Sequence, residues 1–271
     1  MNLIGMATHV ASSSNSILRY ICFACLIAGQ CMFAVFSQAE EGSIDSNAVL
    51  NQETDLTAKQ VELTTDDVAY LTQLGLLRGH LLVGFELYER ALPDMSETHM
   101  KHPNAELYAD LIPAFASRGC EGFAEELSEL ARVVSARKSI EVVTSRYEQL
   151  SVAIHGCETV AEQENRIVVV KVALNLLANA LLEYEIGVVD GVIHNVHEFQ
   201  DAWGFTQVAS RYVQLPIFQA DNEGQLTARR IGRLIASLDP LWPTLNPTRI
   251  DNPIVPSLLQ RMRAYTDRTA E

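Results

Sequence analysis

The feature that most constrains the fold is a long apolar segment, from Ile167 to about Tyr212, that carries one line of polar residues. Residues three or four apart share a face of a helix, so these side chains would form nearly one stripe. The stripe consists of Lys171, Asn175, Asn179, Glu183, Asp190, His194, His197 and Asp201. Either it faces water from an otherwise buried helix, or it lines a polar site inside the protein.

The remaining chain also favours helices. No window alternates at a period of two over several strands, so we expect an all-α fold, an up-and-down helical bundle with additional C-terminal helices. A membrane span is not expected, because Lys171 and Glu183 would lie at hydrocarbon depth. Gly187 and Gly191 are expected to divide the long segment into two helices. Other helices are predicted near residues 64–92, 104–118, 122–136, 139–154, 226–238 and 256–267, within a domain covering 64–271.

The N-terminus has the pattern of an export signal. Residues 1–39 contain one basic residue, Arg19, an apolar run over 17–36 and small residues at Ser37 and Ala39. We expect cleavage after Ala39, a flexible acidic lead over 40–63 and a periplasmic location; an uncleaved membrane anchor is the alternative. The net charge of −14 disfavours nucleic acid and anionic membrane surfaces and permits cationic ligands.

Two cysteines remain after the signal segment, Cys120 and Cys157. In an oxidising compartment an isolated pair predicts a disulfide. Closing this loop would stabilise the fold by roughly 4 kcal/mol in the chain-entropy model. The alternative is two buried, unpaired thiols.

The second half of the stripe holds the best candidate metal ligands. Imidazole and carboxylate groups three or four residues apart can bind one metal ion from one helix face. The candidates are Asp190, His194, His197 and Asp201. The alternative is a solvated polar face near a helix end.

A second group of candidates precedes the stripe. His99 and His102 lie in the segment 95–103, predicted as a loop, whose two methionines would favour Cu(I); the alternative is an ordinary surface turn. Glu86 would lie in a tight helix interface, where it binds metal or pairs with Arg90. His80 is interpreted as a hydrogen-bonded core histidine.

Several classes of enzyme are not supported. The sequence has no Glu-x-x-His pattern of ferritin-like di-iron sites, no nucleotide-binding glycine loop, no nucleophile elbow and no zinc-protease motif. No nucleophile–base constellation remains on which to base a catalytic function, so an enzyme is not expected.

The segment Glu183–Phe205 resembles the periplasmic helical domains associated with bacterial high-affinity iron permeases. The residues at comparable places are Tyr184, Gly187, Asp190, Gly191, Ile193, Glu198, Phe199 and Phe205. The multi-span membrane part of those permeases is missing, so the resemblance implies a detached partner of an inner-membrane metal permease. A weaker similarity is to imelysin-like periplasmic iron-uptake proteins, whose Gly-x-His-x-x-Glu signature is approached by His155 and Glu158, with Ala153 in place of the glycine.

These observations together predict an exported helical-bundle protein that binds a transition metal, iron first and copper second, and delivers or senses it for a permease. The rival hypothesis is a metal-free helical adaptor whose stripe is simply its wet face. A metal-dependent oxidase is a third, less favoured reading, because it would need two metals bridged by carboxylates.

Overall fold

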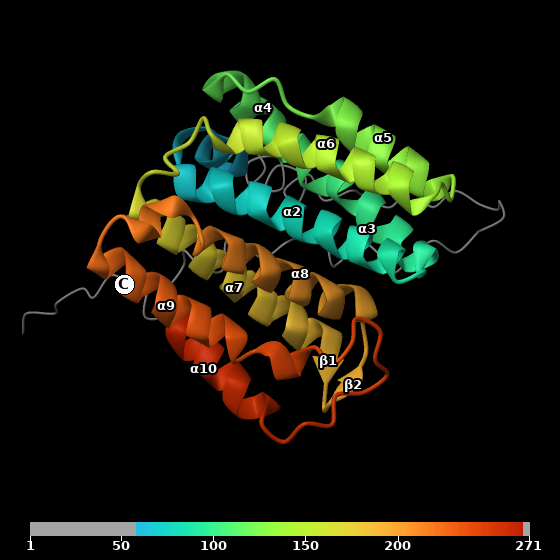
Figure 1. Ribbon diagram of the computed structural model, residues 1–271, viewed down its shortest axis with the longest axis vertical. Helices are drawn as coiled ribbons and strands as arrows, with labels where there is room; N and C mark the ends of the chain where they lie inside the picture. The colour runs from blue at the N-terminus through green and yellow to red at the C-terminus, as the bar shows by residue number, and fades with distance from the viewer. Residues whose placement is uncertain (1–57, 268–271) are drawn as a thin grey trace, which may run out of the picture.

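The computed structural model describes residues 58–267, apart from the side chains of 102–106 and 267. The predicted signal segment and most of the acidic lead lie outside the described residues. The fold is all-α, as predicted, with one short hairpin (Figure 1). Residues 58–65 are helical and are followed by α2 (Asp67–Glu89), α3 (Pro93–Glu106), α4 (Tyr108–Arg118), α5 (Ala124–Ser135) and α6 (Ile140–Glu158). The C-terminal part comprises α7 (Arg166–Gly187), β1 (Val188–Val189), β2 (Val192–Ile193), α8 (Val196–Tyr212), α9 (Asn222–Ala236) and α10 (Val255–Asp267), with 3-10 turns η3 (Pro216–Gln219) and η4 (Asp239–Leu241).

Helix α2 lies at the centre of the fold, between α3 and α6 on one side and α7 and α8 on the other (Figure 1). Its N-terminus is capped by Asp66, whose carboxylate accepts hydrogen bonds from the backbone N–H groups of Val68 and Ala69. Sixteen of its residues are buried, so the helix is apolar almost all round. This central position brings its side chains into contact with helices that come much later in the chain.

The long apolar segment is divided, as expected, where α7 ends at Gly187. A Cβ atom at Gly187 would lie 2.6 Å from the backbone nitrogen of Phe199, so only glycine allows α8 to approach this closely. Asp190 and Gly191 both have positive φ and form the two-residue turn between β1 and β2, the Asp-Gly pattern of a tight hairpin. The stripe is therefore not one continuous helix face.

The first half of the stripe pairs helices. Lys171 is exposed, whereas the amide of Asn175 donates to the hydroxyl of Thr72 on α2 and Asn179 donates to the backbone oxygen of Asn175. Glu183 is buried. Helix α7 is long and apolar enough to span a membrane by length and composition, and 61 % of its most apolar stretch is buried inside the fold.

The segment 95–103 differs from its prediction. It was expected to be a loop, but it belongs to helix α3. Pro93 does end the previous helix, after a turn in which Ala91 has φ of 59°, and it then begins the next one, where its missing N–H costs nothing. His99 is therefore held on a rigid element.

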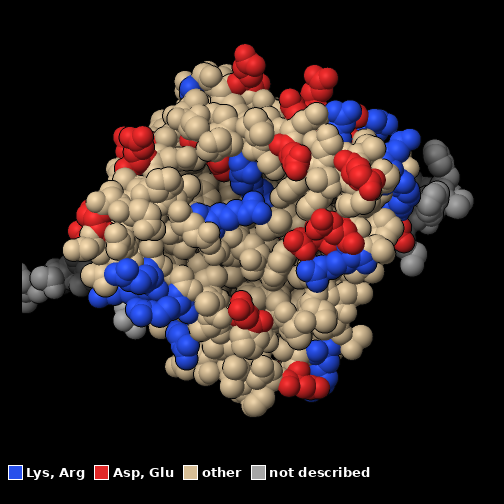
Figure 2. Space-filling model, viewed as in Figure 1, with Lys and Arg blue, Asp and Glu red and all other residues tan. Residues whose placement is uncertain are grey.

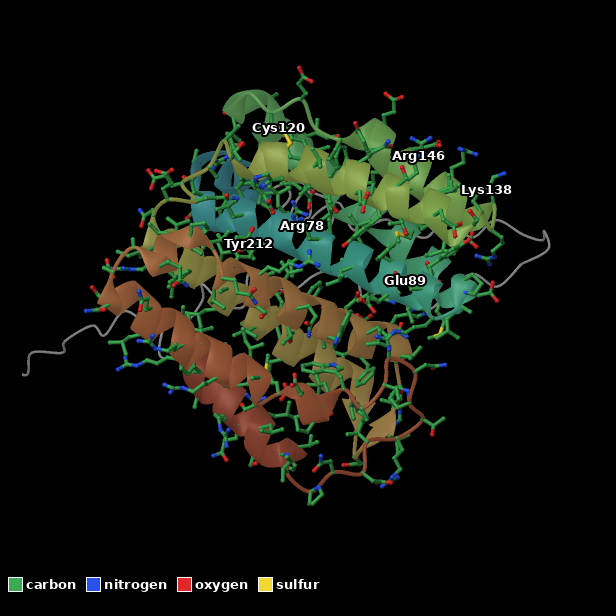
Figure 3. All side chains as sticks on the ribbon, viewed as in Figure 1. Arg78, Glu89, Cys120, Lys138, Arg146 and Tyr212 are labelled. Atoms are coloured by element: carbon green, nitrogen blue, oxygen red, sulfur yellow. A yellow bond between two sulfur atoms is a disulfide. The ribbon has the colours of Figure 1, made fainter. Side chains whose placement is uncertain are left out.

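The predicted disulfide is present, between Cys120 after α4 and Cys157 in the last turn of α6 (Figure 3). Nearby, the hydroxyl of Tyr70 on α2 donates to the backbone oxygen of Cys157. The next residue, Glu158, forms a nearly buried ion pair with Arg78 on α2, at 2.6 Å. These contacts fasten the end of α6 to the central helix.

Candidate metal centre

Three side chains from separate helices converge in the interior: His80 on α2, His99 on α3 and Asp201 on α8. Nδ1 of His80 lies 2.7 Å from Oδ1 of Asp201, and Nδ1 of His99 lies 3.1 Å from the same oxygen. Candidate ligand atoms of all three lie within 4.8 Å of one another. The side chains are 8 %, 2 % and 7 % exposed, so the cluster is buried.

The cluster depends on a close crossing of α2 and α8. At Gly204 an added Cβ would lie 2.5 Å from the backbone oxygen of Gly79, and at Gly79 it would lie 2.4 Å from the ring of Phe205. Gly79 adjoins His80, and Gly204 lies about one turn after Asp201. The two glycines thus allow the imidazole and the carboxylate to meet across the helix interface. The ring of Phe205 packs edge-on against the ring of His80.

The electrostatics of the cluster are those of a buried carboxylate beside positive groups. Burial alone would raise the pKa of Asp201, but His80 and His99 hold it well below its ordinary value. Burial alone would lower the pKa of His99, but Asp201 and then Gln200 raise it above its ordinary value. Among the described residues, Oδ1 of Asp201 is a buried atom without a hydrogen bond of standard geometry. It is the atom that both imidazoles approach.

A second layer of polar side chains surrounds His99. Its Nε2 lies 2.8 Å from Oε1 of Gln200 and 3.5 Å from Nδ1 of His197, which is half-buried. The amide nitrogen of Gln200 in turn donates to the backbone oxygen of Leu245, at 2.7 Å. A small apolar cluster adjoins this layer, because Gln200 contacts two of its members, Met95 and Leu245. The cluster consists of Val83, Leu87, Leu92, Met95, Trp203 and Leu245.

The donor set fits a transition-metal ion. Ligands bound at about 2.1 Å and at right angles are separated by about 3 Å, close to the two distances measured here. Two imidazoles and one carboxylate form the combination found in non-haem Fe(II) sites, and also in some zinc sites. An ion among these atoms would take the place of the direct contacts that both imidazoles make with Oδ1 of Asp201. The chemistry such a site supplies is binding and release of a divalent ion.

The structure brings together only part of the predicted ligand set. His99 and Asp201 meet, and His197 lies beside His99. Asp190 is exposed at the hairpin turn and His194 is exposed just after β2, because the segment between α7 and α8 is not helical. The remaining predicted ligands are Glu86, which pairs with Arg90 at 3.0 Å, and His102, whose side chain is not described.

His80 is the member of the cluster that the predicted ligand set did not include. It was interpreted as a hydrogen-bonded core histidine, and it is indeed buried and paired with Asp201, 121 residues later in the chain. The sequence did contain one sign of this contact: the adjacent Gly79, which allows α8 to approach α2 closely at the level of His80. That approach was expected to enclose Glu86, whereas it encloses His80.

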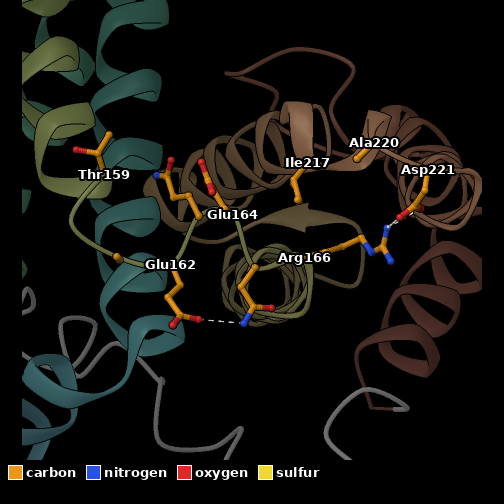
Figure 4. A pocket seen from close by; sticks show the side chains of 10 residues that line it. Thr159, Glu162, Glu164, Arg166, Ile217, Ala220 and Asp221 are labelled. Atoms are coloured by element: carbon orange, nitrogen blue, oxygen red, sulfur yellow. Dashed lines mark hydrogen bonds and ion pairs between the residues drawn. The ribbon is translucent and has the colours of Figure 1, made fainter.

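A separate open hollow of about 830 Å³ lies where α7 begins (Figure 4). The segment 159–166 and residues 217, 220 and 221 line it. The guanidinium of Arg166 is held by Asp221 and Glu223 on its rim. None of the three clustered ligands lines this hollow. On the face shown in Figure 2, acidic and basic side chains are intermixed with much uncharged surface, so the net negative charge is not concentrated there.

Comparison with known proteins concerns the C-terminal part of the chain. Residues 158–267 match the iron permease-associated 4-helix bundle domain. This range contains the four α-helices α7, α8, α9 and α10, and it contains Asp201 but neither His80 nor His99. No curated protein and no solved structure matches the chain. The imelysin-like similarity stays a prediction.

The match links the protein to iron uptake through a membrane permease, at the level of the domain family. It extends well beyond Glu183–Phe205, the segment on which the resemblance was based. The resemblance predicted from the sequence is thus confirmed, as a match of residues 158–267 to the iron permease-associated 4-helix bundle domain.

Proposed function

We propose that this protein binds a divalent transition-metal ion, ferrous iron first, at His80, His99 and Asp201. In this proposal it is exported to the periplasm and delivers the ion to, or senses it for, an inner-membrane permease. The observation that carries the proposal is the convergence of two imidazole nitrogens on one buried carboxylate oxygen. Burying a carboxylate is costly unless it is paired or bound to a metal, so such a cluster requires a strong interaction.

Iron is preferred to copper because of the donor atoms. The three central ligands offer nitrogen and oxygen only, which suits Fe(II), and the family match is to a domain associated with iron permeases. Copper is the second candidate because the thioether of Met95 lies 4.0 Å from the amide nitrogen of Gln200, in the layer outside the three ligands. The periplasmic location is supported by the sequence of residues 1–39 and by the same family match.

The rival function is a metal-free helical adaptor. It predicts that the polar stripe is a solvated face, yet Asn179, Glu183 and Asp201 are buried. The adaptor would still be consistent with a cluster in which His80 and His99 only pair with the buried carboxylate of Asp201. Metal titration separates the two functions, because the adaptor needs no ion.

The test is a titration of the purified, chelator-stripped protein with Fe(II) under anaerobic conditions, in competition with a chromophoric chelator, and with Cu(I) and Zn(II) in parallel. We expect one Fe(II) per chain. Asp201→Asn, which keeps the shape of the side chain, should weaken binding at least about 100-fold because it removes the charged ligand. His194→Ala is the matched control, since His194 is exposed on the hairpin side of α8 and should leave affinity unchanged.

Two results would contradict the proposal. One is a wild-type protein that binds none of the three ions. The other is an equal loss of Fe(II) affinity in Asp201→Asn and His194→Ala, which would place the metal site at the exposed residues Asp190 and His194 instead of the buried cluster. Circular dichroism of each variant verifies that the helical fold is retained.

A further inference from the structure

Gln200 is a fully buried polar residue on α8 and directly precedes Asp201. Its side chain makes two short contacts with groups that lie far apart in the sequence. Oε1 lies 2.8 Å from Nε2 of His99, and Nε2 lies 2.7 Å from the backbone oxygen of Leu245. Both contacts are buried, so water does not compete for them.

The contact with Leu245 fixes the orientation of the amide. A backbone carbonyl only accepts hydrogen bonds, so the NH₂ group of Gln200 must face it. The carbonyl oxygen of Gln200 then faces His99, and an oxygen in that place accepts only if Nε2 of His99 carries a hydrogen. Nδ1, the other ring nitrogen, is left facing Asp201.

We propose that Gln200 is the positioning residue of the metal centre: it holds the proton of His99 on Nε2 and aims Nδ1 at the site. This inference rests on the proposed function and adds to it the group that orients one ligand. His99 would then hold an ion through Nδ1, and its Nε2–H bond to Gln200 would be kept. A ligating histidine typically donates its other N–H in this way, and loss of that acceptor costs about 10- to 100-fold in metal affinity.

The competing explanation is that Gln200 only anchors the loop that contains Leu245. Two substitutions separate these roles. Gln200→Met has a similar volume and loses both contacts. Gln200→Glu keeps an oxygen acceptor for Nε2–H of His99 but cannot donate to Leu245. A positioning residue tolerates glutamate better than methionine, whereas a loop anchor is damaged equally by both.

The first measurement uses the metal-free protein, with ring nitrogens labelled with ¹⁵N. We expect a slowly exchanging, downfield Nε2–H signal from His99. It should shift upfield and exchange faster in Gln200→Met, and shift further downfield in Gln200→Glu because the acceptor is charged. An unchanged signal in Gln200→Met would overturn the inference.

The second measurement is Fe(II) affinity by chelator competition. Gln200→Met should bind about 10- to 100-fold more weakly, with Gln200→Glu much closer to wild type. Equal losses in the two variants would show that Gln200 acts only as the loop anchor. If the wild type binds no metal while the Nε2–H signals behave as expected, the proposed function fails and the positioning contact stands. Should Gln200→Met not fold, Gln200→Glu still decides, because only a direct contact moves the His99 signal further downfield.

Discussion

The close crossing of α2 and α8 predicts that Gly204→Ala will damage both stability and the metal centre. An added Cβ at Gly204 would lie 2.5 Å from the backbone oxygen of Gly79 and 2.7 Å from Cγ2 of Val83. Carbon–oxygen contacts normally begin near 3.3 Å, so the helices would have to separate by about 0.8 Å. Neither obstacle is the far end of a flexible side chain.

The expected cost follows from this displacement. Overpacking of a well-packed interface costs about 1–3 kcal/mol, and alanine regains about 0.5–1 kcal/mol of helix propensity. With the two obstacles this close we expect the upper part of that cost, so the free energy of unfolding should fall by up to about 2.5 kcal/mol. His80 adjoins Gly79 and Asp201 lies one turn before Gly204, so the same displacement would open their 2.7 Å contact towards about 3.5 Å. A site loosened by about 1 Å is expected to lose at least tenfold in metal affinity.

Urea unfolding followed by circular dichroism measures the first effect, and Fe(II) competition measures the second. Gly232→Ala on α9 is the matched control, because an added Cβ there meets nothing within 4 Å. It should raise stability by about 0.5–1 kcal/mol and leave metal affinity unchanged. If Gly204→Ala proves as stable as Gly232→Ala and binds iron as well, the close approach does not set the geometry of the site.

Three further outcomes are expected. Glu158→Gln should lower stability by about 3–5 kcal/mol in urea unfolding, because it leaves Arg78 buried without its counter-charge. Reduction of the disulfide should lower it by at most about 4 kcal/mol, measured with and without reductant. In the presence of a metal chelator, the contribution of Asp201 to the free energy of unfolding is lost as the pH falls below about 4, because its pKa is lowered in the fold. The contribution of His99 is lost as the pH rises above about 6.5, because its pKa is raised in the fold. Both contributions are complete between these two pH values. Bound metal should reverse the loss at high pH.

Local patterns in the sequence predicted most of the fold because they depend on neighbouring residues. The apolar period gave the helices, Pro93 ended α2, and Gly187 ended α7. The error at α3 has a physical cause. Proline was taken as a stop, whereas in the first turn of a helix it is favourable. The Asp-Gly pair also favours a hairpin turn, but the apolar residues around it led us to expect only a break between two helices, without strands.

The site was less predictable because its ligands are brought together by tertiary contacts. Asp201 and His99 were among the candidates since residue type alone favours them, but their partner His80 is on a helix whose contacts with α8 have no signature in sequence spacing. Their spacing placed Asp201 and His194 on one face of a predicted helix, but α8 begins only at Val196, after the hairpin, so His194 is not on that helix. Gln200 gave no signal, because a glutamine acquires its role only from what it touches.

The three clustered side chains come from both sides of the boundary of the matched segment at residue 158. Helices α7 to α10 supply only Asp201, whereas both imidazoles come from α2 and α3, before residue 158. A 4-helix bundle with this sequence but without the preceding helices would hold one carboxylate and its Gln200 neighbour, and no complete ligand set. If the proposed function is correct, metal binding requires that the N-terminal helices pack against the segment 158–267. The distances from His80 and His99 to Asp201 are thus set by how α2 and α3 pack against α8, and not within the matched segment alone.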